Sequence, residues 1–328
     1  MAAAAGAAFV TGGSGFIGKR LVRRLVAEGR PVRALARSDR SAAAIAELGA
    51  EPVQGDLDDA DSMAAGAAGC ELAFHLAAHL GQWGTRAEFE RGNVAGTRNA
   101  LEGCRRAGVR RFVHCSTEAV LVAGEPLVQV DETAPRRPDS KALYAATKAE
   151  AEQLALEANG DGIETVVLRP RLVWGTGDTT LLPAIAEQVR AGRFAWISGG
   201  RHLTSTTHVE NVVEGLMLAA ERGQAGEIYF VTDGEPVVFR EFISDLIRSQ
   251  GLEPPTRSIP LPLARAVAAV SETAWRALPL RGEPPVSRLA VWLAGQECTI
   301  DISKARRELG YEPVKRLGEG LAELSTLA

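Results

Sequence analysis

The sequence predicts an α/β protein whose core is a doubly wound parallel β-sheet. Short apolar segments of strand length alternate with amphipathic segments of helical length through the first two-thirds of the chain. A glycine-rich turn follows the first of these strands, and several helical segments end at glycine. Such alternation is typical of a parallel sheet that is covered by helices on both faces.

The composition is that of a globular protein, and it argues against some classes of binding partner and site. Of the 328 residues, 46% are apolar and 24% are charged, which leaves ample material for a core. The net charge of −4 argues against nucleic acid as the main partner. The four cysteines are widely spaced and form no metal-binding motif with histidine, so we expect no metal site and a reduced, cytoplasmic protein.

The N-terminal segment and the lengths of the apolar runs bear on targeting and on membrane insertion. The N-terminal segment has no cationic stretch ahead of its apolar residues and leads directly into the glycine-rich turn, so we expect no signal peptide. A transmembrane helix would need about 18 consecutive apolar residues, and we find no such run.

The predicted strands define the expected domain organisation. They occupy 7–12, 31–37, 51–56, 71–78, 111–117 and 164–170, with helical segments at 16–29, 93–108 and 144–160 between them. A further helix–strand unit follows at 208–233. We predict a sheet domain over 1–172, to which 204–235 return, and a smaller C-terminal substrate-binding lobe over 173–203 and 236–328.

The C-terminal lobe contains an amphipathic helical segment at 261–278. Its apolar stripe consists of Leu263, Val267, Val270, Ala274 and Leu278. We expect this segment to cover the substrate pocket or to lie on lipid as an interfacial helix. The polar face mixes Arg265, Glu272 and Arg276, which argues against lipid.

The glycine-rich turn predicts a dinucleotide site. In "FVTGGSGFIG" (9–18), three glycines spaced three apart follow a strand and open a helix. Glycine permits the tight turn and lets a pyrophosphate approach backbone N–H groups at the helix N-terminus. The sheet is therefore expected to be of the Rossmann type. The residues assigned to this turn are Gly12, Ser14, Gly15, Phe16, Ile17 and Gly18.

The end of the second strand bears on the choice between NAD and NADP. A carboxylate at this position would hydrogen-bond the ribose hydroxyls of NAD and repel a 2′-phosphate. The chain instead has Ala36 followed by Arg37, and its first carboxylate is Asp39. A guanidinium binds phosphate well, so we favour NADP(H). The alternative is an exposed arginine with NAD still bound.

A tyrosine and a lysine four residues apart predict acid–base chemistry. Tyr144 and Lys148 in "YAATK" share one helix face, one turn apart. We expect the ammonium group to lower the pKa of the phenol, so that Tyr144 can exchange a proton with a ketone or an alcohol. Lys148 can also hold the nicotinamide ribose.

Ordered motifs resemble the extended short-chain dehydrogenase/reductase family. After the TGxxGxxG turn, "GDL" (55–57), "HLAA" (75–78), "CST" (115–117), "YAATK" (144–148) and "LRPRLVWG" (168–175) occur in order. Within that family, stretches such as "STEAVLVAGEPL" and "RPRLVWGTGDTTLLP" are most similar to the 3β-hydroxysteroid dehydrogenase-like branch, and "AAHLGQWG" (77–84) and "ISKARRELGYEP" (302–313) fit its 2-alkyl-3-oxoalkanoic acid reductases particularly well. That branch includes bacterial reductases of long-chain 2-alkyl-3-oxoalkanoic acids.

The resemblance implies roles for individual residues. Thr117 takes the position of the third catalytic hydroxyl beside Tyr144 and Lys148, with Ser116 as the reserve candidate. The family also implies a homodimer. The cofactor contacts that it implies are Asp56 and Leu57 at the adenine, Ala77 and Ala78 in the cleft, and Pro170, Leu172 and Val173 near the nicotinamide.

The expected function is oxidation or reduction of a bulky hydrophobic alcohol or ketone. His79 and Trp83 are candidate substrate contacts, whereas His75 and His114 lie in predicted strands and are expected to be core residues. One alternative is a nucleotide-sugar epimerase or dehydratase that keeps NAD tightly bound. Another is a dinucleotide-sensing module without catalysis, against which the complete set of catalytic hydroxyl and amino groups argues.

Overall fold

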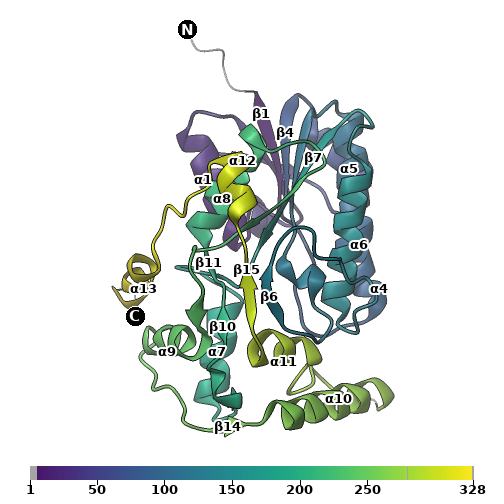
Figure 1. Cartoon of the computed structure of the whole chain (residues 1–328). Helices are drawn as coiled ribbons and strands as arrows, with labels where there is room; N and C mark the ends of the chain where they lie inside the picture. Colours follow the sequence, from purple (N-terminus) through teal and green to yellow (C-terminus); the bar gives the residue numbers. More distant parts are fainter. Residues whose placement is uncertain (1–5, 279, 327–328) are drawn as a thin grey trace.

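The central feature of the computed structural model is a seven-stranded sheet, described within residues 6–278 and 280–326. Its strand order is β12-β7-β5-β4-β1-β2-β3, and every neighbouring pair is parallel (Figure 1). The strands are β1 (Ala7–Thr11), β2 (Val32–Ala36), β3 (Glu51–Gln54), β4 (Cys70–His75), β5 (Arg111–Cys115), β7 (Glu164–Pro170) and β12 (Ile228–Val231). The predicted fold class and the positions of all seven strands are confirmed.

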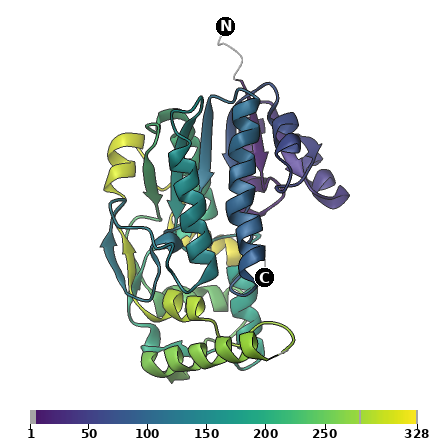
Figure 2. The ribbon, with the colours of Figure 1, turned by 90° about the vertical axis from the view of Figure 1, so that its right-hand side faces the viewer.

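Helices cover both faces of the sheet, as Figures 1 and 2 show. One face packs against α3 (Ala60–Ala67), α5 (Gly96–Arg106) and α6 (Leu143–Glu157). The other packs against α1 (Phe16–Ala27), α2 (Asp39–Ala46) and α8 (Val209–Arg222). The strand order reverses between β1 and β4, and ligands of open α/β sheets bind outside the strand ends at such a point.

The remaining segments lie beyond the carboxyl ends of the strands or along the sheet edge. A four-stranded sheet joins β6 (Leu127–Val130), β10 (Leu203–Thr204), β13 (Val237–Val238) and β15 (Cys298–Ile300). Two-stranded pairs join β8 (Val173–Trp174) to β11 (Thr207–His208) and β9 (Trp196–Ile197) to β14 (Ser258–Ile259). The helices here are α7 (Leu181–Arg190), α9 (Phe239–Arg248), α10 (Leu261–Ala277), α11 (Arg288–Gly295), α12 (Ser303–Leu309) and α13 (Leu317–Thr326).

The C-terminal part of the chain contributes helices to two separate regions of the molecule. Helix α10 lies at the far end of the molecule, whereas α12 packs against α8 and β12 on the main sheet (Figure 1). The domain ranges given above stay predictions, and 1–5, 279 and 327–328 within them lie outside the described residues. None of the described helices is long and apolar enough to span a membrane.

The apolar stripe of α10 faces outward, not into a pocket. Val270 is 69% exposed and Leu263 is 51% exposed. The opposite face is the buried one, where Ala264 and Ala268 pack against Val291 of α11. Small residues on this buried face allow the close approach of α11. The same face carries Glu272 and Arg276, which line a pocket beside Tyr144, so α10 reaches a pocket with this face and not with its apolar stripe.

Two histidines are buried side by side in the sheet, as expected of core residues. His75 of β4 pairs in register with His114 of β5, and their ring centroids lie 5.5 Å apart. Thr11 and Thr97 hydrogen-bond the two ring nitrogens of His75, whereas neither nitrogen of His114 has a partner among the described residues. Burial, with a smaller effect of the Lys148 charge, lowers the pKa of His75 to about 3 and that of His114 well below its usual value.

We expect these histidines to make the fold sensitive to mild acid. Below about pH 6.5 the unfolded chain binds protons that the folded chain does not bind, so the unfolding free energy falls as pH falls. Each histidine contributes a loss of up to about 1.4 kcal/mol per pH unit in this range. Substituting His114→Met should remove one contribution, measured by urea unfolding between neutral pH and pH about 5. An unchanged slope in this variant would contradict the account.

Candidate active site

The glycine-rich turn joins β1 to α1 at the point where the strand order reverses. Gly12 has a φ of +74°, and a Cβ there would lie 2.8 Å from the backbone nitrogen of Ala77. A Cβ on Gly18 would lie 2.0 Å from the carbonyl oxygen of Gly12. At Gly12, the turn after β1 and the segment after β4 therefore lie so close together that no side chain fits. At Gly18, the helix lies equally close to the turn itself.

The N-terminus of α1 offers backbone donors to an anion. Gly15 is the N-cap residue and no side chain caps the helix, so the N–H groups of the first turn are not used by a capping side chain. Ser14, Phe16 and Ile17 lie in this same turn. A glycine cradle that leads into an uncapped helix N-terminus fits the pyrophosphate of a dinucleotide.

The predicted adenine contacts lie at the ends of β2 and β3. Arg37 directly follows β2 and is exposed, and Ser38 after it caps α2. Asp56 follows β3, where its carboxylate accepts from the backbone N–H of Asp58 at 3.2 Å. Leu57 is partly buried, and its carbonyl accepts from the Asn99 amide at 2.8 Å. These positions line up along one side of the strand ends, as a bound adenosine would require.

Helix α6 presents Tyr144 and Lys148 toward the end of β5. Lys148 is 3% exposed, and its Nζ donates to the Cys115 carbonyl at 2.9 Å. Tyr144 is partly exposed, and its hydroxyl lies within hydrogen-bond reach of Thr117, the second residue beyond β5. The structure therefore brings the three predicted catalytic residues to one place.

The pKa of Tyr144 is shifted in the direction opposite to the one expected from the sequence. Burial, followed by the negative charge of Glu118, raises the pKa of Tyr144 above its usual value, whereas we expected Lys148 to lower it. The Lys148 ammonium is directed to the carbonyl of Cys115, and burial lowers its own pKa. A raised pKa keeps the phenol protonated at neutral pH, the state of a proton donor.

Ser116 and Thr117 have different environments. The Ser116 hydroxyl is buried and donates to Glu152 at 2.6 Å, and Glu152 pairs with the buried guanidinium of Arg169. The Thr117 hydroxyl, by contrast, lies at the Tyr144 phenol and donates to Glu118 at 2.8 Å. This arrangement favours Thr117 over Ser116 as the third hydroxyl.

The predicted nicotinamide contacts follow β7. Pro170 is the last residue of β7 and pairs with Val231 of β12. Leu172 has a φ of +42°, which is unusual for a residue other than glycine, and Val173 then pairs with Thr207. A strained residue at a strand end is often part of a binding site, which agrees with the assigned position. Ala78 lies in the segment after β4, on the other side of β5.

A small pocket opens at Tyr144. It is lined by Gln82, Trp83, Gly84, Phe89, Lys141, Ala142, Leu143, Tyr144, Glu272, Arg276 and Leu289. The structure thus brings Trp83 and Tyr144 to the same pocket. His79 is not part of this lining: its ring packs edge-on against Phe89, and Asn93 hydrogen-bonds its backbone.

Three polar residues near this site were not found from the sequence. Asn93 is 2% exposed, lies in the π-helical turn η1 (Glu90–Ala95), and donates to Thr147 between Tyr144 and Lys148. Such turns are frequent at functional sites but have no simple sequence signal. The other two are Glu118, in the 3₁₀ turn η2 (Glu118–Leu121), and Arg171. The sequence signal available for both was a charged residue directly after an apolar strand segment. Two further short elements of the fold are α4 (Arg86–Phe89) and η3 (Ser198–Gly200).

Comparison with known proteins identifies the family. The model of the 3-beta hydroxysteroid dehydrogenase/isomerase family matches residues 9–263. This chain belongs to that family. It is 51% identical, over 92% of its length and 91% of the relative's, to a "4-hydroxy-2-methyl-3-oxo-4-farnesyl-3,4-dihydroquinoline-1-oxide ketoreductase" of Stigmatella aurantiaca. The predicted family and branch are confirmed.

Two further relatives extend the comparison. A "2-alkyl-3-oxoalkanoate reductase" of Stenotrophomonas maltophilia is 38% identical over 96% of this chain and 97% of the relative. A solved structure of a dTDP-glucose 4,6-dehydratase from Streptomyces venezuelae with NAD bound has a TM-score of 0.77 and 25% identity, covering 97% of this chain and 95% of that one. The predicted enzyme class is confirmed: the chain is an oxidoreductase of the short-chain dehydrogenase/reductase type.

The glycine turn can be tested separately from catalysis. We expect Gly18→Ala to lower the unfolding free energy by about 1 to 3 kcal/mol, because the added methyl group must displace the Gly12 carbonyl. The measurement is urea unfolding without cofactor. Gly318→Ala in α13 is the matched control, because a Cβ there meets no atom within 4 Å. Equal stability of Gly18→Ala and the control would contradict the described turn.

Proposed function

We propose that this enzyme reduces the ketone group of a bulky hydrophobic 3-oxo substrate to a secondary alcohol, with NADPH as the electron donor. The observation that carries the proposal is the convergence of Tyr144, Thr117 and Lys148 at the carboxyl end of β5, where Tyr144 also lines the pocket. This combination supplies a proton donor, a second hydroxyl and a buried cation within one cleft.

In the proposed mechanism, the cofactor supplies the hydride and Tyr144 supplies the proton. The Tyr144 hydroxyl donates to the ketone oxygen as negative charge develops there, and Thr117 holds the phenol in position. Lys148 lies one turn further along α6 and would hold the ribose hydroxyls of the cofactor. The raised pKa of Tyr144 keeps the phenol protonated at neutral pH, as its role of proton donor in ketone reduction requires.

The assignment of NADP(H) rests on the end of β2. Arg37 is exposed there, with Ser38 capping α2 and no carboxylate at the final strand position, Ala36. A guanidinium in this place can bind a 2′-phosphate in a bidentate manner. The acidic side chain of Asp39 lies within the first turn of α2 and is the feature that would favour NAD instead.

A hydrophobic substrate is supported chiefly by the relatives, because the lining of the small pocket mixes apolar side chains with the charged Lys141, Glu272 and Arg276. Trp83, Phe89, Leu143 and Leu289 supply apolar lining next to Tyr144. One relative is named as a reductase of a farnesylated quinoline oxide and another as a reductase of 2-alkyl-3-oxoalkanoates; both names describe an oxo group on an apolar skeleton. We therefore assign a 3-oxo compound with a long alkyl, prenyl or steroid-like skeleton. A homodimer and a cytoplasmic location stay predictions.

A nucleotide-sugar epimerase or dehydratase is the second candidate, favoured by the similarity to the NAD-bound dehydratase. Such an enzyme recycles its NAD and would purify with the cofactor bound. NADPH consumption with a 3-ketosteroid or a long-chain 3-oxo acid, and none with a 4-keto nucleotide sugar, separates the two candidates.

We expect Tyr144→Phe to lower kcat by about 10²- to 10⁴-fold, because the proton donor is lost while the ring and its packing remain. NADPH affinity, measured by fluorescence titration, should change little. Turnover close to that of the wild type in this variant would show that another group supplies the proton.

We expect Arg37→Ala to weaken NADPH binding by about 10- to 100-fold and to leave NADH binding nearly unchanged, because only NADPH carries the 2′-phosphate. Both affinities can be measured by fluorescence titration. Arg23→Ala, an exposed arginine on α1, is the control that should affect neither. Equal losses for both cofactors in Arg37→Ala would reject the phosphate assignment.

A further inference from the structure

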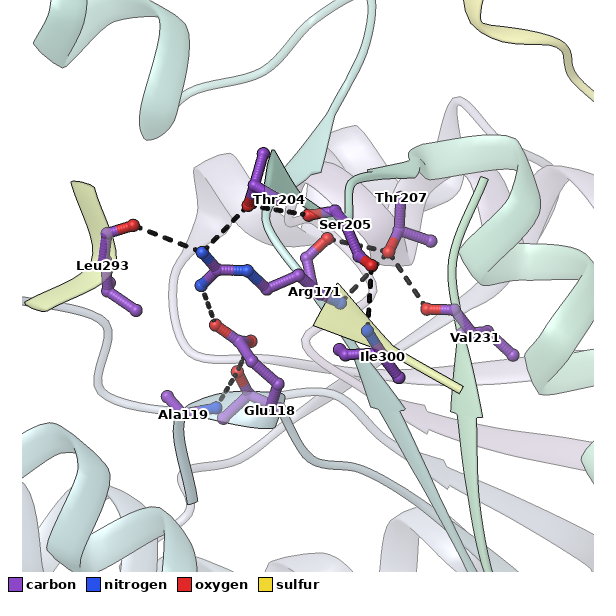
Figure 3. A network of polar contacts seen from close by, with 10 residues as sticks. Glu118, Ala119, Arg171, Thr204, Ser205, Thr207, Val231, Leu293 and Ile300 are labelled. Atoms are coloured by element: carbon purple, nitrogen blue, oxygen red, sulfur yellow. Dashed lines mark hydrogen bonds and ion pairs between the residues drawn. The ribbon is translucent and has the colours of Figure 1, made fainter. Parts of the chain in front are cut away.

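A buried ion pair lies directly behind the proposed proton donor. Glu118 is 3% exposed and Arg171 is fully buried, and their side chains form an ion pair. Figure 3 shows the two side chains meeting, Glu118 from the turn after β5 and Arg171 from the segment after β7. Burial of two charges is unfavourable unless the surrounding groups also hydrogen-bond them, so the contacts of this pair are informative.

Glu118 reaches the site through Thr117. One carboxylate oxygen, Oε1, accepts from the Arg171 guanidinium, and the other, Oε2, accepts from the Thr117 hydroxyl at 2.8 Å. The same Thr117 oxygen accepts from the backbone N–H of Ala119 at 3.2 Å. The single hydroxyl proton of Thr117 is thereby directed to Glu118, and these two hydrogen bonds fix the orientation of the Thr117 hydroxyl beside the Tyr144 phenol.

Arg171 links Glu118 to the C-terminal helix α11. Its Nη2 donates to the Thr204 hydroxyl and to the Leu293 carbonyl of α11, each at 3.2 Å (Figure 3). Its backbone N–H donates to the Thr207 hydroxyl at 3.0 Å. Leu293 and Tyr144 both pack against the same small apolar cluster of Val122, Ala142, Ala145 and Leu289. The guanidinium therefore holds α11 at a fixed position relative to the proton donor.

We propose that Glu118 and Arg171 form a positioning pair for proton transfer, which fixes the Thr117 hydroxyl beside Tyr144 and ties this end of the cleft to α11. The proposal rests on the proposed function. Glu118 is not a general base in this account, because both of its oxygens are occupied. Its charge also acts on the phenol over a short distance, and this raises the pKa of Tyr144 and keeps the donor protonated.

Other ionisable groups face Tyr144 as well. They are Cys115 at the end of β5, Lys148 on α6, and Lys141, Glu272 and Arg276 around the pocket. Of these, Cys115 raises the pKa of Tyr144 less than Glu118 does. A substitution at Glu118 leaves all of these groups in place, so a change in the titration of Tyr144 reports the loss of the Glu118 charge.

The test is the titration of Tyr144 in wild type, Glu118→Gln and the double variant Glu118→Gln/Arg171→Gln. The double variant removes both charges and so avoids an unpaired buried arginine, which could prevent folding of the single variant. Carbon-13 NMR of ring-labelled tyrosine resolves this residue from the other two tyrosines, and Tyr144→Phe assigns its signal. We expect Tyr144 to titrate about one pH unit or more lower in both variants.

Activity provides the second readout. We expect kcat for ketone reduction to fall by about 10- to 100-fold in both variants, because Thr117 is no longer held in position. The decline of kcat at alkaline pH should also begin at a lower pH than in the wild type. The matched control is Glu152→Gln, which breaks the neighbouring buried pair with Arg169 but contacts neither Thr117 nor Tyr144. In this variant the Tyr144 titration should stay where it is in the wild type.

Two results would overturn the positioning role. One is a folded double variant with wild-type kcat and wild-type Tyr144 titration. The other is an equal shift of the Tyr144 titration in Glu152→Gln, which would show a general effect of disturbing the core. If wild-type protein reduces no ketone in the panel, the proposed function fails, whereas the NMR titration still decides the role of the pair.

Discussion

Two arginines at the end of β7 constrain the whole carboxyl edge of the sheet. Arg169 and Arg171 are both fully buried, and neither can lose its charge at any ordinary pH. Each therefore needs a buried carboxylate: Glu152 on α6 serves the first and Glu118 after β5 serves the second. Because removing one member of a buried pair costs about 3 to 5 kcal/mol, these pairs hold β5, β7 and α6 together in one arrangement.

The chemistry of the cleft follows from this arrangement. Neighbouring residues at a strand end point to opposite sides, so Ser116 turns into the core toward Glu152 and Thr117 turns toward Tyr144. Helix α6, which contributes Glu152 to the core, also carries Tyr144 and Lys148 two and one turns earlier. The groups that stabilise the fold and the groups proposed to move protons are thus placed by the same short segments.

Much of this could be predicted from the sequence, because local patterns determined it. The strands have short apolar runs, and the glycine turn and the YAATK helix carry their spacing in the sequence itself. The Glu118–Arg171 pair could not be found in this way, because its members are 53 residues apart and meet only after β5 and β7 pair. Likewise, the outward stripe of α10 and the raised pKa of Tyr144 depend on burial, which spacing does not reveal.

The central claim is direct hydride transfer to a ketone carbon with protonation of its oxygen by the protein. The most direct measurement is the mass spectrum of the alcohol formed from a long-chain 3-oxo acid or a 3-ketosteroid with NADPH deuterated at C4, using each C4 stereoisomer in turn. We predict one deuterium on the carbinol carbon with one stereoisomer and none with the other. An alcohol without deuterium from both stereoisomers, or no alcohol from either substrate, would contradict the account.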